Sequence, residues 1–159
     1  MSEPITLVRV ESEEHIAEVR ELFLEYAAAI GVDLEYQGFT AELAALPFPY
    51  LPPRGVLLIA KINGESAGCV AMRRLDAQTG EMKRLYVRPA FRSWGLGKQL
   101  ISEVIQAARR NGYKVLRLDT LPSMVAAQRL YRSLGFSEIP AYNSTHSPGT
   151  RFYELGLAV

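Results

Sequence analysis

Disulfides, long apolar runs and a strong net charge are all missing from this 159-residue sequence. Its one cysteine, Cys69, excludes an internal disulfide and agrees with a reducing, cytoplasmic compartment. The longest apolar runs, Ala27 to Ile30 and Val56 to Ala60, are far too short to cross a bilayer, and the N-terminus contains no secretory signal. We therefore expect a soluble, cytoplasmic protein without a membrane partner.

The net charge is only +1, yet the charges are distributed unevenly along the chain. Residues 1–50 contain two cations and ten acids, whereas residues 51–159 contain sixteen cations and seven acids. This asymmetry fits either separate faces for an anion and a cation, or a solvated acidic helix face with scattered surface cations. The cations form no dense tract interleaved with aromatic residues, so nucleic acid is not an expected partner.

Hydrophobic periodicity divides the chain into strands and helices that fit one domain, residues 1–159. Ser12 and Gly31 bound the first helical pattern, and Asn63-Gly64 predicts a tight hairpin. The order predicts an α/β fold, in which an antiparallel meander feeds a βαβ crossover and helices flank a mixed sheet. The expected strands are residues 6–10, 56–62, 67–73, 81–87, 114–119, 137–139 and 150–157, and the expected helices are residues 12–31, 40–46, 96–111 and 122–134.

The stretch FRSWGLGKQL, residues 91–100, places Gly95 and Gly97 at the beginning of a helix. The first N–H groups of a helix have no partner within it and carry a partial positive charge, so phosphate is their natural ligand. Arg92 and Lys98 add mobile positive charge at either end of the turn. From residue 73 to residue 98 there are seven cations and two acids, which also favours a polyanionic ligand.

Two phosphate-binding motifs fit this stretch poorly. A P-loop would need glycine at Arg92 and a hydroxyl residue at Gln99. A dinucleotide fingerprint would need glycine at Leu100, although Asp119 does lie about twenty residues further on, where that fingerprint has an acid. A dinucleotide site therefore stays open as a third hypothesis.

A third motif fits in sequence and in context. Residues 92–97, RSWGLG, match Arg/Gln-x-x-Gly-x-Gly/Ala, and they lie between EMKRLYVRPAF and LYRSLGF. Together these blocks resemble the GNAT superfamily of acyl-CoA-dependent N-acyltransferases, over roughly residues 5–157. The resemblance implies a GNAT-like fold with a mostly antiparallel sheet, a βαβ crossover and one splayed strand pair. It also implies acetyl-CoA as the co-substrate.

The resemblance assigns coenzyme contacts to two segments and to one loop residue. Backbone N–H groups of the glycine turn would bind the pyrophosphate, and the end of the strand before the turn would pair with pantetheine. Many relatives carry an asparagine where this chain has Met124, so the adjacent Ser123 is the expected substitute. The residues implied for the coenzyme are Leu85, Tyr86, Val87, Arg92, Ser93, Trp94, Gly95, Leu96, Gly97, Lys98 and Ser123.

The resemblance also implies two catalytic residues. Tyr131 matches the family tyrosine that hydrogen-bonds the coenzyme sulfur, and its alternative role is that of a core aromatic at helical spacing. Glu81 begins the strand where many relatives place a glutamate that deprotonates the acceptor, and its alternative is a solvated acid at a strand end. An alkylamine has a pKa of about 10.4 and is protonated near neutrality, so a base would help. No histidines or carboxylates have metal-ligand spacing, so no metal is expected.

The expected function is transfer of an acetyl group from acetyl-CoA to a primary amine by direct attack. The acidic region that includes Asp33, Glu35 and Glu42 covers the acceptor side in such folds and predicts a cationic acceptor. A non-catalytic acyl-CoA-binding or sensor module is the alternative. The late strands often form dimer contacts in relatives, which leaves a homodimer open.

Overall fold

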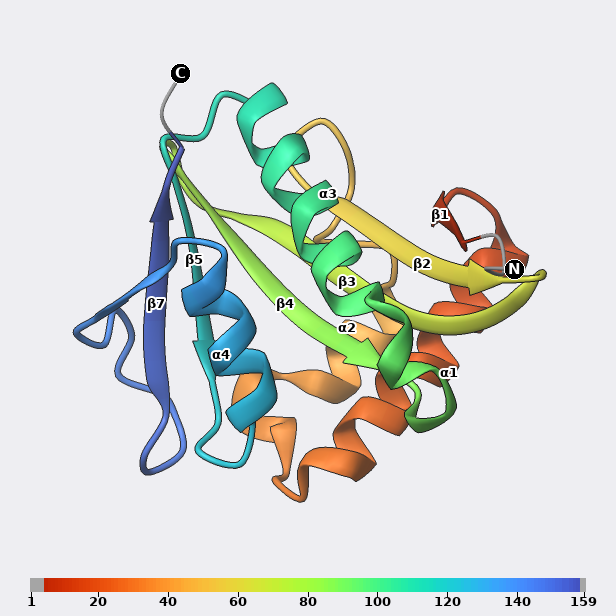
Figure 1. Cartoon of the computed structure of the whole chain (residues 1–159), viewed down its shortest axis with the longest axis horizontal. Helices are drawn as coiled ribbons and strands as arrows, with labels where there is room; N and C mark the ends of the chain where they lie inside the picture. Colours follow the sequence, from red (N-terminus) through yellow and green to blue (C-terminus); the bar gives the residue numbers. More distant parts are fainter. Residues whose placement is uncertain (1–4, 158–159) are drawn as a thin grey trace.

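The computed structural model describes residues 5–157, which form a seven-stranded sheet with helices on both faces (Figure 1). The strand order is β1-β2-β3-β4-β5-β7-β6, and the pairs are antiparallel except for β4 with β5. This confirms the expected mixed, mostly antiparallel sheet. The strands are β1 (Ile5–Arg9), β2 (Val56–Ile62), β3 (Glu65–Asp76), β4 (Thr79–Val87), β5 (Val115–Thr120), β6 (Ser137–Ile139) and β7 (Arg151–Gly156). The α-helices are α1 (Glu13–Ile30), α2 (Phe39–Ala45), α3 (Leu96–Arg110) and α4 (Val125–Ser133), and the 3₁₀ segments are η1 (Leu34–Gln37) and η2 (Pro89–Trp94).

Local sequence signals fix the ends of the first helix and the first hairpin. The Ser12 hydroxyl accepts a hydrogen bond from the His15 N–H at 3.1 Å and caps α1. Gly31 ends α1 with φ 68°, in the left-handed region that glycine adopts without a Cβ penalty. Asn63 and Gly64 also have positive φ, 51° and 80°, as the tight turn between β2 and β3 requires.

The sheet separates two hydrophobic cores. Alternate residues of β2 point to opposite faces, so Leu58 packs with α3 and α4 on one face, while Ile59 packs with α1 and α2 on the other. Both faces of β2 are buried, which explains its continuous apolar run. Figure 1 shows α3 and α4 in front of the sheet and α1 behind it.

Several boundaries differ from the sequence expectations. β3 is longer than expected, from Glu65 to Asp76 instead of residues 67–73, and β1 and β5 are each shifted by one residue. β4 begins at Thr79, two residues early, because the turn at Asp76 is tighter than expected and its carboxylate accepts the Gln78 N–H at 2.9 Å. α4 begins at Val125, since residues 122–123 form a turn closed by the Met124 N–H on the Leu121 carbonyl at 3.0 Å. The 3₁₀ segments η1 and η2 were not expected. Within residues 5–157, no helix is both long and apolar enough to span a bilayer.

Candidate active site

β4 and β5 separate soon after they meet. They pair in parallel only from Thr79 to Glu81 on β4, and beyond that point the end of β5 pairs with β7 alone. From residue 82 to residue 87, the edge of β4 that faces β5 therefore has no strand partner among the residues that the structure describes, while the opposite edge pairs with β3. Its free backbone N–H and C=O groups can bind an extended ligand by main-chain pairing.

A β-bulge lies on the same part of β4. Cys69 of β3 pairs with Tyr86, and Ala71 pairs with Lys83, so two residues of β4 oppose one residue of β3. One of the two is Arg84, which has φ 62°. The bulge shifts the alternation of side chains, so that Arg84 lies on the same face of the sheet as Lys83. That face bears α1 and α2.

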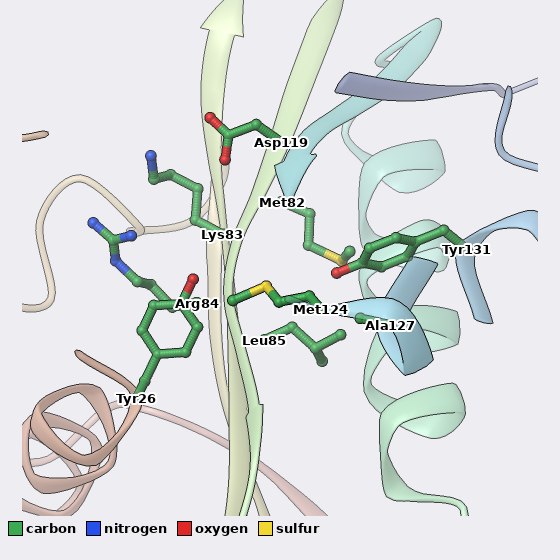
Figure 2. A pocket seen from close by; sticks show the side chains of 9 residues that line it. All are labelled: Tyr26, Met82, Lys83, Arg84, Leu85, Asp119, Met124, Ala127 and Tyr131. Atoms are coloured by element: carbon green, nitrogen blue, oxygen red, sulfur yellow. The ribbon is translucent and has the colours of Figure 1, made fainter. Parts of the chain in front are cut away.

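A small pocket lies where β4 and β5 separate (Figure 2). Its volume is about 30 Å³, room for about two water molecules. Side chains from both faces line it. On the α1 and α2 side these are Tyr26, Lys83, Arg84 and Asp119, and on the α3 and α4 side they are Met82, Leu85, Met124, Ala127 and Tyr131.

Tyr131 lies on α4 and reaches this pocket from the second side. Its side chain is buried, and its ring packs 5.7 Å from Phe136 and 6.2 Å from Tyr153 between ring centroids. Figure 2 shows its hydroxyl turned into the pocket. Burial raises the pKa of Tyr131 well above its usual value, so the phenol stays protonated and can donate a hydrogen bond at neutral pH.

Glu81 lies on β4, outside the lining of this pocket. It is 2% exposed, and both of its carboxylate oxygens are engaged. The Arg73 Nε donates to one oxygen at 2.8 Å, and the Tyr142 hydroxyl donates to the other at 2.6 Å. The structure therefore does not bring the two predicted catalytic residues, Tyr131 and Glu81, together in one cavity.

A buried ion pair connects the bulge of β4 to α2. The Arg84 guanidinium donates to both carboxylate oxygens of Glu42, at 2.7 and 3.1 Å, and also to the Gln37 side-chain oxygen at 2.8 Å. The Tyr50 hydroxyl donates to the same carboxylate at 2.8 Å. Lys83 reaches Gln37 as well, at 3.3 Å. Sequence analysis missed this cluster, although cations at positions 83 and 84 of an otherwise buried strand were a signal for it.

The acids of the N-terminal third are mostly engaged with partners inside the protein. The Asp33 carboxylate accepts the Glu35 N–H at 2.9 Å, and Glu35 accepts the Thr40 N–H at 2.9 Å. Glu42 is held by Arg84. Only the Glu42 carboxylate among these three acids is therefore balanced by a cation, and Asp33 and Glu35 stay exposed.

The glycine turn has the geometry of an exposed anion site. Arg92, Ser93, Trp94 and Gly95 are exposed, whereas Leu96 is buried and anchors the beginning of α3. Gly95 has φ 76° and supplies the turn into the helix. The first N–H groups of α3 face away from the helix body without intrahelical acceptors.

The turn is also tied to its neighbours. The Arg92 Nε donates to the Val87 carbonyl at 3.1 Å, which joins the turn to the end of β4. A Cβ on Gly97 would lie 3.2 Å from the Leu130 side chain, so this glycine allows α3 to approach α4 closely. Lys98 is exposed on the first turn of α3.

The remaining predicted coenzyme residues lie near the point where β4 and β5 separate, or in the turn before α4. Leu85 lines the pocket, Val87 packs against the α3 core, and the ring of Tyr86 packs against Tyr26 at 6.3 Å between centroids. Ser123 is exposed in the turn before α4, and the adjacent Met124 lines the pocket. In residues 5–157, no three His, Cys, Asp or Glu side chains are grouped so as to hold a metal ion.

The chain is similar to known acetyltransferases in sequence and in structure. The sequence model of the acetyltransferase (GNAT) family matches residues 16–136. An uncharacterized N-acetyltransferase of Schizosaccharomyces pombe is 35% identical over 156 residues, which cover 97% of this chain and 96% of the relative.

Two solved structures share the fold. A GNAT-family acetyltransferase from Staphylococcus aureus has a TM-score of 0.83 at 24% identity, covering 98% of this chain and 100% of the other. The yncA protein of Salmonella typhimurium, solved with its cofactor acetyl-CoA, has a TM-score of 0.68 at 23% identity, covering 98% and 95%.

Proposed function

Because the chain belongs to the GNAT acetyltransferase family, we propose that it transfers the acetyl group of acetyl-CoA directly to a primary amine. The observation that carries this proposal is the small pocket beside the unpaired edge of β4, which is lined from both faces of the sheet and into which the Tyr131 hydroxyl is turned (Figure 2). A thioester in this pocket would be reachable from both faces of the sheet. The coenzyme would enter from one face, and the acceptor from the other.

In this proposal the coenzyme lies along β4 and ends at the glycine turn. The pyrophosphate binds the N–H groups of residues 92–98, where Arg92 and Lys98 add positive charge. The pantetheine arm pairs with the free backbone of residues 85–87 and takes the place that a neighbouring strand would otherwise fill. Ser123 and Met124 lie just before the beginning of α4, and Met124 lines the pocket beside this path.

The reaction then needs one bond to form and one to break. The neutral amine attacks the acetyl carbonyl carbon, a backbone N–H on β4 stabilises the oxyanion, and the carbon–sulfur bond breaks. Tyr131 donates a hydrogen bond to the departing thiolate, which is a role for a phenol that keeps its proton. The acceptor arrives as an ammonium ion, so a base must first remove one proton to give the neutral amine. After the attack the nitrogen loses a second proton, which ends on the thiol. Glu81 remains a predicted base.

A cationic acceptor remains part of this proposal, but its support differs from the sequence argument. Glu42 is paired with Arg84 and cannot be counted as a free acidic surface, whereas Asp33 and Glu35 accept hydrogen bonds from neutral groups and stay exposed. The acid that does line the pocket on the acceptor side is Asp119.

The test combines binding and turnover. Acetyl-CoA should give heat on titration in calorimetry, whereas NAD should give none. Release of the coenzyme thiol should depend on a primary amine from a panel of butylamine, spermidine, lysine and aspartate. The substitution Tyr131→Phe should lower kcat at least tenfold and leave the dissociation constant of CoA unchanged.

A matched control is Tyr113→Phe, since Tyr113 is also buried but its hydroxyl donates to the Arg54 carbonyl, 2.6 Å away at the other end of the sheet. This variant should keep the wild-type kcat. Binding of acetyl-CoA without turnover of any amine would support the sensor module instead. Binding of NAD without CoA would support a dinucleotide site.

A further inference from the structure

Asp119 occupies a distinctive place in the fold. It lies near the end of β5, two residues beyond Arg117, which makes the last pair with β4. Side chains alternate along β5, so Leu118 enters the core beneath α3 while Asp119 points to the opposite face. There it lines the pocket together with Lys83 and Arg84. Figure 2 shows its carboxylate turned toward the pocket from the β5 side.

The Asp119 carboxylate has no protein partner in this position. It makes no hydrogen bond or ion pair within residues 5–157, whereas the neighbouring carboxylates of Glu42 and Glu81 each have both oxygens engaged. A carboxylate that is mostly out of water and unpaired is destabilising, because desolvation disfavours its charge. The unpaired Asp119 carboxylate has a physical reason if a cationic group of a bound ligand forms an ion pair with it.

Charged and titratable groups face Asp119 from each element around it. Burial raises the pKa of Asp119, the Lys83 cation opposes that shift, the Glu81 charge adds to it, and Arg84 and His146 oppose it. The phenols of Tyr26 on α1, Tyr131 on α4 and Tyr142 in the loop before β7 also lie within range of its charge. A carboxylate with a raised pKa is a better general base for an amine than an ordinary one.

We infer that Asp119 binds the ammonium group of the acceptor and accepts its proton. The inference deepens the proposed function and rests on it. In the balanced step, one proton passes from the ammonium nitrogen to the Asp119 carboxylate, and the nitrogen lone pair then forms the bond to the acetyl carbon. The carbon–sulfur bond breaks, and the amide nitrogen loses its second proton to the sulfur. Asp119 returns its proton to water when the products leave.

In this scheme Asp119 replaces Glu81 as the base, and Glu81 takes a positioning role. Its carboxylate is held by Arg73 and by Tyr142, the latter from the loop between β6 and β7, so it fixes that loop over the acceptor side of the sheet. Its negative charge also contributes to the raised pKa of Asp119.

The test is the pH dependence of kcat/KM for the best amine of the panel, in the wild type and in Asp119→Asn. The wild type uses the ammonium form together with the ionised base. Its kcat/KM should therefore stay level between the pKa of Asp119 and that of the amine, about 10.4. Without the base, the variant can use only the neutral amine. Its kcat/KM should fall at least 100-fold at pH 7 and rise tenfold per pH unit up to the amine pKa.

Matched controls separate this role from a structural one. Asp76→Asn makes the same change in the exposed turn between β3 and β4 and should leave the profile of the wild type intact. Asp119→Asn should also keep the wild-type affinity for acetyl-CoA, measured by calorimetry. Glu81→Gln should lower kcat/KM while keeping the level profile, because Asp119 is still present.

The outcomes distinguish the two proposals. If the wild type binds acetyl-CoA but acetylates no amine of the panel, the proposed function fails. If the wild type is active and Asp119→Asn retains more than a tenth of its kcat/KM at pH 7, the inference about Asp119 is wrong. It is equally wrong if the variant is slower but keeps a level profile, or if Glu81→Gln instead shows the tenfold rise per pH unit.

Discussion

Removing Glu42 tests whether the buried ion pair holds the bulge of β4 against α2. In Glu42→Ala, the Arg84 guanidinium loses both carboxylate hydrogen bonds and keeps only the one to Gln37. The side chain of Arg84 is 2% exposed and that of Glu42 is 9% exposed, so water cannot replace the lost partner without rearrangement. Breaking a buried pair in this way typically costs about 3–5 kcal/mol of unfolding free energy.

A less buried pair, Lys61 with Glu18, provides the control. Its shortest distance, 2.9 Å, is close to the 2.7 Å between Arg84 and Glu42, but its side chains are 19% and 23% exposed. Glu18→Ala should therefore cost no more than about 1 kcal/mol. The substitution and the shortest distance are nearly matched, so the difference between the two variants reflects the deeper burial of Arg84 and Glu42 and the additional hydrogen bond that Glu42 accepts.

Chemical denaturation at pH 7, followed by circular dichroism, measures both losses. For a chain of this length, the larger loss corresponds to a decrease in Tm of about 6–20 °C. A double variant that replaces Arg84 and Glu42 with Met and Leu should recover much of the stability, because it leaves no uncompensated charge. If Glu42→Ala costs no more than Glu18→Ala, the argument from burial is refuted.

Three further predictions concern stability and reactivity. Gly95→Ala places a Cβ at φ 76° with no other atom within 4 Å, so backbone strain alone should lower the free energy of unfolding by about 1–2 kcal/mol in urea denaturation. Gly156→Ala also places its Cβ in open space but without positive φ, and it should cost less than about 0.5 kcal/mol. Equal losses in the two variants would contradict this account. Cys69 is fully buried, and burial raises the pKa of its thiol, so maleimide should label it only in the unfolded protein. Rapid labelling of the native protein at neutral pH would show that the core is open. The raised pKa of Asp119 means that its ionised form destabilises the folded state above that pKa; Asp119→Asn should therefore raise Tm at pH 7, and the gain should disappear as the pH falls below the unfolded value of about 3.9. A gain that grows toward acid pH would contradict the sign of this shift.

The elements of the fold were predictable where the signal is local. Ser12, Gly31 and Asn63-Gly64 act on backbone groups within a few residues of themselves, so their effect does not depend on the rest of the fold. The boundary of α4 was predicted less well. Pro122 and Ser123 suit the first turn of a helix and a reverse turn equally, and the structure uses them in the turn.

The site was predictable in outline only. The motif around Gly95 indicated the position of the glycine turn. Tyr131 is predicted to lie near the reacting centre, and it lines the pocket between β4 and β5. The contact of Arg84 with Glu42 joins residues 42 positions apart and depends on how α2 packs on the sheet, which no local pattern specifies. Asp119 was noticed only as a residue of a dinucleotide fingerprint. The side of the sheet on which it lies became meaningful once the separation of β4 from β5 was visible.

The short contact between β4 and β5 also divides the sheet mechanically. Three residue pairs, from Thr79–Val115 to Glu81–Arg117, are the whole of the strand pairing that joins β1–β4 to β5–β7 in the part of the chain described. A coenzyme lying between the separated ends would contact both parts. Slow amide hydrogen exchange should then extend into β6 and β7, beyond the residues that the ligand touches. While it is bound, the substrate would serve as a structural member of the protein that consumes it.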